Sequence, residues 1–309
     1  MYLNERRRGF TIVELLIVIV VIGILAAVTL IVYNGISNKA KVSNVQAAIS
    51  QTSRKITAYA LTNQDVYPST LDDAGITDTN DVSYQYVVDN GSNPRTFCIA
   101  ATTQGTSYSW NSTDQKSSEG KCSITNIVTN PSFKIDANGW ARNISPGLSA
   151  SGTLMTDPTI PLSGINTMYR LRITAGSGSY WRAGTNLPVT GGQVYSFSSY
   201  VKTNTSMDVH IAIQWKDASG SGISAIYPTT SVSANAWTRI SSARTAPTNA
   251  TTVLLQVGSP ANGIVNNTLD ITGVMLTTGA FLYQYADGDS SGWTWNGTPN
   301  NTSSTGKPV

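Results

Sequence analysis

The sequence predicts an α+β protein in which a long N-terminal helix carries a small antiparallel sheet head, followed by an all-β sandwich. Three observations predict this class. An apolar run near the N-terminus continues into a pattern of helical period. Three short β-like runs with a turn signal come next. From about residue 124 the chain changes to many short runs spaced by Gly, Pro and Asn.

The composition favours an extracellular all-β protein over a cytosolic enzyme, since only 12 % of the 309 residues are charged. The net charge is +3, and residues 1–9 contribute +2 of it through three arginines and one glutamate. The near-neutral remainder lacks the clustered basic surface that nucleic-acid binding requires. No nucleic-acid partner is therefore expected.

The apolar run covers residues 10–33 and contains one charged side chain, Glu14. A helix of this length measures about 36 Å, enough to cross a hydrocarbon core of ~30 Å. The arginines at 6–8 precede it, so the positive-inside rule keeps the N-terminus cytoplasmic and sends the rest outward. A single-pass membrane protein is expected.

Two simpler interpretations compete for this run. A secretory signal peptide has a shorter apolar region, although Leu25-Ala26-Ala27 imitates its small-residue cleavage site. A plain signal anchor fits the length but leaves Glu14 unexplained, because an acid inside an apolar helix is costly and usually functional. Composition alone leaves the plain anchor open.

The string RRRGFTIVELLIVIVVIGILAAV at residues 6–28 resembles the class III signal of type IV prepilins and pseudopilins. The resemblance implies that a prepilin peptidase cuts after Gly9 and methylates the new N-terminus at Phe10. Glu14 then becomes the fifth mature residue. Its carboxylate is expected to pair with the α-amine of a neighbouring subunit in the apolar filament core, where low dielectric makes the pair a check on register. Many family members have a proline within this helix, whereas this chain has only Gly23 and Gly35 as breakers.

After the apolar run, apolar residues recur at steps of three and four and extend the predicted assembly helix to about Asn63, so that it spans residues 10–63. The pilin head is expected to span residues 64–123. The head contains three predicted strands, at 82–88, 96–102 and 106–110. Its two cysteines, Cys98 and Cys122, are expected to form a disulfide because the chain is exported. Two buried free thiols are the alternative. With a single histidine in the chain, a zinc site is a poor interpretation.

The C-terminal part predicts a sandwich over 124–286 and a tail over 287–309. Its segments NIVTNPSFKIDANGW, GGQVYSFSSYVKT and LDITGVMLTTG resemble jelly-roll carbohydrate-binding modules of the family 4/9/22 type. The closing residues resemble a segment that follows such modules in phage structural proteins. The predicted strands are 168–174, 193–202, 207–216, 237–244, 252–257 and 268–276.

Period-2 alternation places polar and aromatic side chains together on outward faces of these strands. We expect them to line one concave sugar-binding surface, because planar amides and guanidiniums beside an aromatic ring suit a sugar. A solvated sheet face is the alternative. The loop GSGSYWRAG is expected to add an aromatic platform through Tyr180 and Trp181. The candidates for the concave surface are Tyr200, His210, Gln214, Arg170, Arg172 and Gln256.

No cofactor is expected. Modules of this resemblance often hold a structural Ca²⁺, for which Asp270 matches one ligand position, but Lys134 stands where a second acid would be. We expect Lys134 to lie beside Asp270 and replace the cation, with Asp136 as the remaining ligand candidate.

The resulting hypothesis is a type IV pilus subunit, structural or minor, that polymerises through its helix and displays a glycan-binding adhesion domain. The expected partners are other pilin subunits, the prepilin peptidase, the inner-membrane pilus assembly machinery and a surface glycan. The precursor is placed in the membrane and the assembled subunit in an extracellular pilus. One alternative is a pseudopilin of a type II secretion or DNA-uptake machine. A surface glycan-active enzyme is a further alternative, but no catalytic motif favours it.

Overall fold

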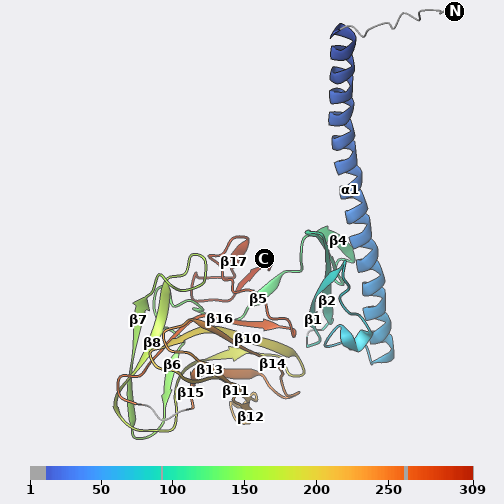
Figure 1. Ribbon diagram of the computed structural model, residues 1–309. Helices are drawn as coiled ribbons and strands as arrows, with labels where there is room; N and C mark the ends of the chain where they lie inside the picture. Colours follow the sequence, from blue (N-terminus) through green and yellow to red (C-terminus); the bar gives the residue numbers. More distant parts are fainter. Residues whose placement is uncertain (1–11, 92, 261–263, 309) are drawn as a thin grey trace, which may run out of the picture.

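The computed structural model describes residues 12–91, 93–260 and 264–308. A long helix carries a small sheet at its C-terminal end, and a β-sandwich lies beside that sheet (Figure 1). The predicted α+β class is confirmed.

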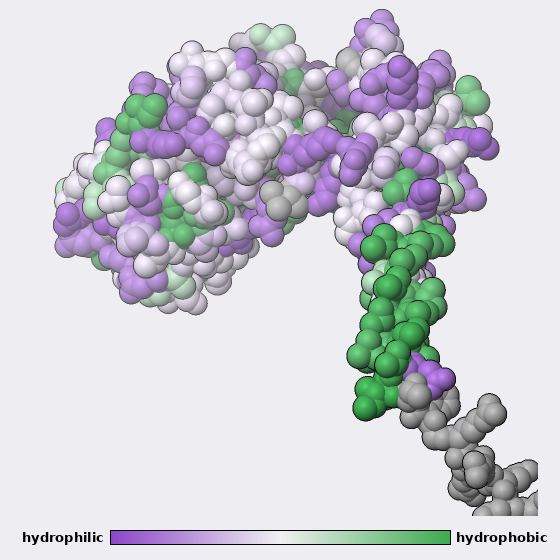
Figure 2. Space-filling view, turned by 90° about the horizontal axis from the view of Figure 1, so that it is seen from above, coloured by the Kyte–Doolittle hydropathy of each residue, from purple (hydrophilic) through white to green (hydrophobic). Residues whose placement is uncertain are grey.

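Helix α1 runs from Ile12 to Thr62 and is 51 residues long, or about 76 Å. Its N-terminal half is exposed and apolar, and it protrudes from the rest of the molecule (Figure 2). By length and composition this helix can cross a membrane. In its C-terminal half, Val45, Ile49 and Ile56 are buried against the head sheet, as the helical stripe predicts. Within the described part of the chain, the N-terminal half of α1 is therefore free of contacts with the head, whereas the C-terminal half packs against the head sheet.

The head sheet has four antiparallel strands in sequence order. Three match the predicted runs, and the fourth is a short polar edge strand that carries no apolar signal. A 3₁₀ turn, η1 (Asp72–Ala74), lies in the connection from the helix. The strands are β1 (Ser83–Asp89), β2 (Thr96–Thr103), β3 (Thr106–Asn111) and β4 (Lys116–Glu119).

The predicted disulfide is confirmed: Cys98 on β2 is bonded to Cys122, with 5.9 Å between their Cα atoms. Closing a loop of this size stabilises a fold by roughly 3 kcal/mol in the chain-entropy model. The bond ties the segment that carries β4 back to the sheet and fixes the point where the chain enters the C-terminal domain.

The sandwich consists of two antiparallel sheets packed face to face. The first sheet has the strand order β14-β10-β16-β8-β7. Its strands are β7 (Leu148–Thr156), β8 (Thr167–Gly176), β10 (Val194–Thr203), β14 (Thr238–Thr245) and β16 (Thr268–Thr278).

The second sheet has the order β12-β11-β15-β9-β6, and β13 also pairs with β11. Inward side chains of both sheets, such as Phe197, Ile213 and Leu255, form the shared core. The strands of the second sheet are β6 (Ala141–Ile144), β9 (Trp181–Pro188), β11 (Met207–Lys216), β12 (Gly222–Ile226), β13 (Thr229–Val232) and β15 (Thr252–Ser259).

The C-terminal segment differs from the predicted separate tail. Its strands β17 (Trp293–Trp295) and β18 (Ser304–Gly306) form a small sheet with β5 (Ile124–Asn126), the first strand after the head. Trp293 and Met275 of β16 are buried in one cluster, so this sheet packs over the outer face of the first sandwich sheet. The end of the chain thus closes onto the start of the sandwich.

Hydrogen bonds join the head to the sandwich. Gln85 of β1 holds Cys122, near the end of the head, through two hydrogen bonds of 3.0 Å to its backbone, and Gln85 Nε2 also donates to the Tyr283 hydroxyl at 3.4 Å. Gln193 Nε2 donates to Asp89 Oδ1 at 3.0 Å, and Lys307 Nζ donates to the carbonyl of Glu119 at 2.7 Å. These contacts fix the orientation in which α1 carries the sandwich.

Candidate functional site

The predicted sugar-binding residues do not form one surface, because they divide between the two sheets. Tyr200 lies on β10 of the first sheet, whereas His210 lies on β11 of the second. The outer faces of the two sheets point away from each other across the shared core. The prediction of a single concave surface is therefore wrong. On the first sheet with Tyr200 are Arg170 and Arg172, and on the second with His210 are Gln214 and Gln256.

The prediction that Trp181 forms an exposed platform is also wrong. Trp181 is the first residue of strand β9 and only 1 % exposed, with its side chain in the sandwich core beside that of Ala183. Tyr180 precedes the strand and remains half-buried at the surface. The Gly/Ser-rich run at residues 176–179 resembles a loop. Strand β9 nevertheless begins at Trp181, directly after Tyr180.

The outer face around Tyr200 is covered by the chain itself. The Arg239 guanidinium lies 5.7 Å from the Tyr200 ring and also donates to the carbonyl of Tyr283. Arg170 makes two hydrogen bonds to Asp270, at 2.6 and 2.8 Å, and Arg172 donates to Asn266 Oδ1 at 2.7 Å. These groups already have partners, so this face is a poor place for a ligand.

The outer face of the second sheet is built differently. Strands β12 and β13 pair in turn with the same edge of β11, and the break between them contains Tyr227-Pro228. Proline has no backbone N–H to continue a strand ladder, which favours the break at this point. Tyr227 is 48 % exposed, and its ring lies 5.7 Å from that of His210 in an edge-on arrangement.

Arg182 crosses this face from β9. Its guanidinium carbon lies 4.3 Å from the centroid of the Tyr180 ring and 5.0 Å from that of Tyr227. We call these three residues the arginine stack. Gly258, the partner of Arg182 on β15, permits the crossing, because a Cβ there would lie 2.3 Å from Arg182 Cγ.

Gln256 reaches across the same face in the opposite direction. A Cβ on Gly184 of β9 would lie 2.5 Å from Gln256 Cγ, so the glycine leaves room for the glutamine side chain. Gln214 faces outward on β11, on the same side as His210. Gln214 and the arginine stack make a polar surface that includes two tyrosines, and the side chain of Gln256 is nearly buried within it.

His210 is buried beneath this surface, with 1 % of its area exposed. Neither ring nitrogen has a hydrogen-bond partner among the described residues. Burial, and secondly the charge of Arg182, lower the pKa of His210 from 6.5 to about 4. The ring is therefore neutral at physiological pH and offers one donor and one acceptor.

The lowered pKa of His210 predicts a loss of stability in mild acid. Between pH 6.5 and about 4 the unfolded chain binds a proton that the folded chain refuses. The contribution of His210 to the free energy of unfolding should fall over this window by up to roughly 3 kcal/mol and stay level below it. Urea unfolding of the full chain and of His210→Gln across this pH range measures the effect. The difference between the two curves isolates the histidine from the carboxylates. Parallel curves would contradict the prediction.

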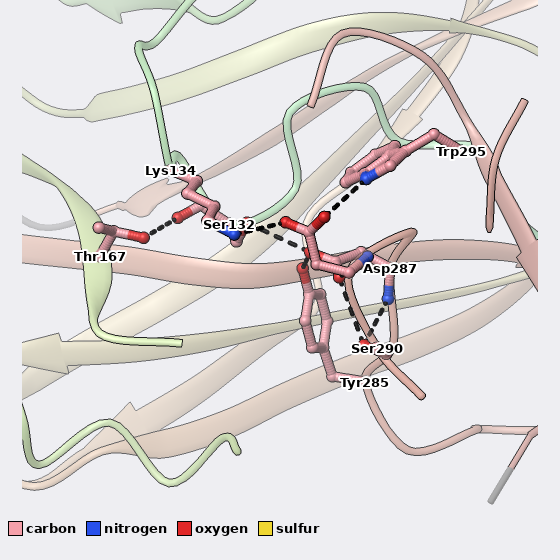
Figure 3. Close-up of polar contacts among 8 residues, drawn as sticks. Ser132, Lys134, Thr167, Tyr285, Asp287, Ser290 and Trp295 are labelled. Atoms are coloured by element: carbon pink, nitrogen blue, oxygen red, sulfur yellow. Dashed lines mark hydrogen bonds and ion pairs between the residues drawn. The ribbon is translucent and has the colours of Figure 1, made fainter. Parts of the chain in front are cut away.

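The expected neighbour of Asp270 is also corrected. Lys134, labelled in Figure 3, forms an ion pair with Asp289 at 2.7 Å. The cation beside Asp270 is Arg170. Asp136 accepts hydrogen bonds from Asn130 and Asn138. Within residues 12–91, 93–260 and 264–308, no group of three or more His, Cys, Asp or Glu side chains is arranged to hold a metal.

The predicted processing site lies outside the described residues, since Gly9 and Phe10 precede them. Glu14 lies in the first turn of α1, on the exposed apolar half of the helix. Sequence reasoning missed Arg182 and Tyr227. The alternation in WRAGTNLP, with Arg182 opposite in phase to Trp181, is the signal that places Arg182 on the outer face.

Comparison with known proteins agrees with this two-part structure. Residues 5–30 match the model of the prokaryotic N-terminal methylation motif, and residues 125–263 match the model of a carbohydrate binding domain. The chain is therefore similar to type IV pilins in its N-terminal part and to carbohydrate binding domains in its C-terminal sandwich.

Among curated proteins, the fimbrial protein of Neisseria meningitidis serogroup A is 36 % identical over 85 residues, covering 28 % of this chain and 49 % of that protein. The type IV major pilin PilE of Neisseria gonorrhoeae is 34 % identical over 93 residues, covering 29 % of this chain and 55 % of PilE. The chain thus spans about half the length of the curated relatives it matches.

Among solved structures, the C-terminal family 22 carbohydrate binding module of Clostridium thermocellum Xyn10B is 16 % identical, with a TM-score of 0.39. That match covers 52 % of this chain and 96 % of the module. Tailspike protein 4 of bacteriophage CBA120 is 17 % identical, with a TM-score of 0.42, and the match covers 50 % of this chain and 21 % of the tailspike.

Proposed function

We propose that the chain is a type IV pilus subunit that polymerises through α1 and displays its sandwich to bind a surface glycan. The methylation motif and the similarity to fimbrial proteins support the assembly half of this proposal. The same motif supports the expected processing by a prepilin peptidase at Gly9 and the expected placement in the membrane before assembly. The exposed apolar half of α1 supplies the surface that other pilin subunits and the assembly machinery would contact.

One observation carries the glycan-binding half: unpartnered polar groups lie beside tyrosine rings on the outer face of the second sheet. Both nitrogens of His210 and the Nε of Arg182 are buried without hydrogen-bond partners among the described residues. A buried polar group without a partner is costly, so its retention favours a ligand that supplies one. Sugar hydroxyls can do so while their C–H faces pack on Tyr180 and Tyr227.

The test uses the full chain in detergent on a glycan array. We expect Tyr227→Ala and Gln214→Ala to weaken binding of a captured glycan by roughly tenfold, the effect of removing about 1.4 kcal/mol of contact energy. Tyr200→Ala is the matched control, because that tyrosine lies on the covered face of the first sheet. Equal losses in all three variants would place the site elsewhere, and capture of no glycan even by multimeric chains would refute glycan binding. Many copies on a pilus would gain avidity from a weak site.

The proposal includes no metal. Arg170 supplies positive charge at Asp270, which is 2 % exposed, so we expect the sandwich to fold without Ca²⁺. The melting temperature of the full chain should be unchanged by EDTA. A fall of many degrees, reversed by added Ca²⁺, would show that a metal is required.

The proposed role is binding without catalysis. Release of new reducing ends from a bound polysaccharide would contradict it and favour the glycan-active enzyme. The pseudopilin alternative uses the same N-terminal motif, but the curated relatives described above are fimbrial proteins and major pilins, which favours a pilus. Chains recovered in sheared pili support the pilus, whereas chains confined to the envelope support the pseudopilin.

A further inference from the structure

Arg182 differs from the other arginines of the sandwich in having no oxygen partner among the described residues. Its Nε is buried without an acceptor, and its printed contacts are the two tyrosine rings of the arginine stack. Elsewhere in the sandwich each described guanidinium donates to a carboxylate, amide or backbone oxygen. These partnered arginines are Arg142, Arg170, Arg172, Arg239 and Arg244.

The stack leaves the donors of Arg182 available at its edge. The contacts of the Arg182 guanidinium with the rings of Tyr180 and Tyr227 supply no oxygen acceptor, so its N–H groups still lack one among the described residues. These two contacts also restrict the side chain, which reduces the entropy lost when an acceptor binds. The stack therefore presents a fixed fork of donors to the outer face of the second sheet.

The surroundings of the fork are partly desolvated. His210, 1 % exposed and unpartnered at both nitrogens, lies under Tyr227, and Gln256 is 3 % exposed on the adjacent strand. A charge-assisted hydrogen bond gains strength where water is excluded, and salt screens it less than at an exposed site. An arginine fork matches a carboxylate bidentately, and the neutral imidazole and the amide suit the hydroxyls beside it.

We propose that the arginine stack is the anchor for a carboxylate group of an acidic glycan, one built from uronic acid residues. The carboxylate accepts two hydrogen bonds from Arg182, the adjacent hydroxyls meet His210 and Gln256, and the sugar rings pack against the tyrosines. This inference rests on the proposed glycan-binding function and deepens it by naming the chemical class of the ligand.

The test compares two ligands that differ only in the charged group: oligogalacturonate and its methyl ester. Isothermal titration of the full chain in detergent should give at least tenfold tighter binding of the acid. The preference should shrink as salt rises, because it depends on charge. Neutral xylan and glucan oligosaccharides complete the series.

Three variants locate the preference. Arg182→Ala should abolish the difference in affinity between the acid and the ester (the acid-over-ester ratio). It should leave the weak binding of the ester intact, and this remaining binding shows that the variant is folded. Arg182→Lys keeps the charge but loses the planar fork and its stacking, so it should retain only a small part of the ratio. Arg244→Ala removes the same charge from an exposed position on β14 of the other sheet and should leave the ratio unchanged.

The outcomes separate this inference from the function on which it rests. Equal binding of the acid and the ester, or of neutral oligosaccharides and the acid, overturns the anchor and leaves glycan binding standing. A ratio lost equally in Arg182→Ala and Arg244→Ala means general charge attraction, which also overturns it. Binding of none of these ligands, nor of any glycan on the array, overturns both.

Discussion

Replacing Glu14 with alanine should reduce entry of the chain into filaments by at least tenfold. Glu14 is the acidic residue in the first turn of α1, within an exposed apolar half-helix. In a filament this half-helix would be buried against other copies, where an ionic pair is strong when made and costly when one partner is missing. Pairing with the α-amine that cleavage creates at Phe10 would therefore select the correct register between subunits.

Quantitative immunoblots of sheared pili, normalised to the cell-associated chain, measure this effect. Glu14→Gln should behave like Glu14→Ala, because the amide keeps the shape but not the charge. Glu119→Gln on the exposed edge strand β4 makes the same chemical change on the head sheet, outside the apolar half of α1, and should assemble normally. Filament yields at the wild-type level for either Glu14 variant would refute the pairing.

Local features of this fold could be predicted from the sequence because they depend on neighbouring residues. The helical stripe through Val45, Ile49 and Ile56 and the alternation on β10 and β11 are set by side-chain period, and the structure contains both. Strand β4 was missed because its four side chains are all exposed, so it carries no alternating apolar pattern.

The alternation of side chains along a strand could not predict which residues of the candidate site lie together. Period-2 alternation says which side chains share a face of one strand, but not which sheet the strand joins. Strands β10 and β11 are separated by only a few residues, yet the chain crosses from one sheet to the other between them. Tyr200 and His210 thus look outward in opposite directions, although each faces away from the core as expected.

Long-range placement of side chains explains the remaining differences. Arg182 comes near Tyr227 only because β9, β15 and β11 are adjacent in the second sheet and Gly258 leaves room between them. The C-terminal segment behaves similarly: its partner, β5, lies more than a hundred residues earlier in the chain. Neither pairing has a local signal that a single sequence could supply.

Replacing Asp287 with alanine should lower the free energy of unfolding of the sandwich by about 3–5 kcal/mol, the range for breaking a buried, hydrogen-bonded charged group. Asp287 is fully buried at the start of the C-terminal segment. Its Oδ2 accepts hydrogen bonds from Tyr285 at 2.7 Å and Ser132 at 3.3 Å (Figure 3). Its Oδ1 accepts them from the backbone N–H of Asp289 at 3.1 Å and the Ser290 hydroxyl at 3.3 Å.

The size of this effect follows from the groups left behind. Burial, followed by the charge of Asp287, raises the pKa of Tyr285 well above its ordinary value, so its hydroxyl remains a donor that would lose its acceptor. The matched control is Asp289→Ala, two residues away, whose ion pair with Lys134 is partly exposed and should contribute about 1 kcal/mol or less. Urea unfolding of the full chain in detergent, followed by tryptophan fluorescence, compares the two variants. Equal losses for Asp287→Ala and Asp289→Ala would show that the buried carboxylate does not hold the C-terminal sheet against the sandwich.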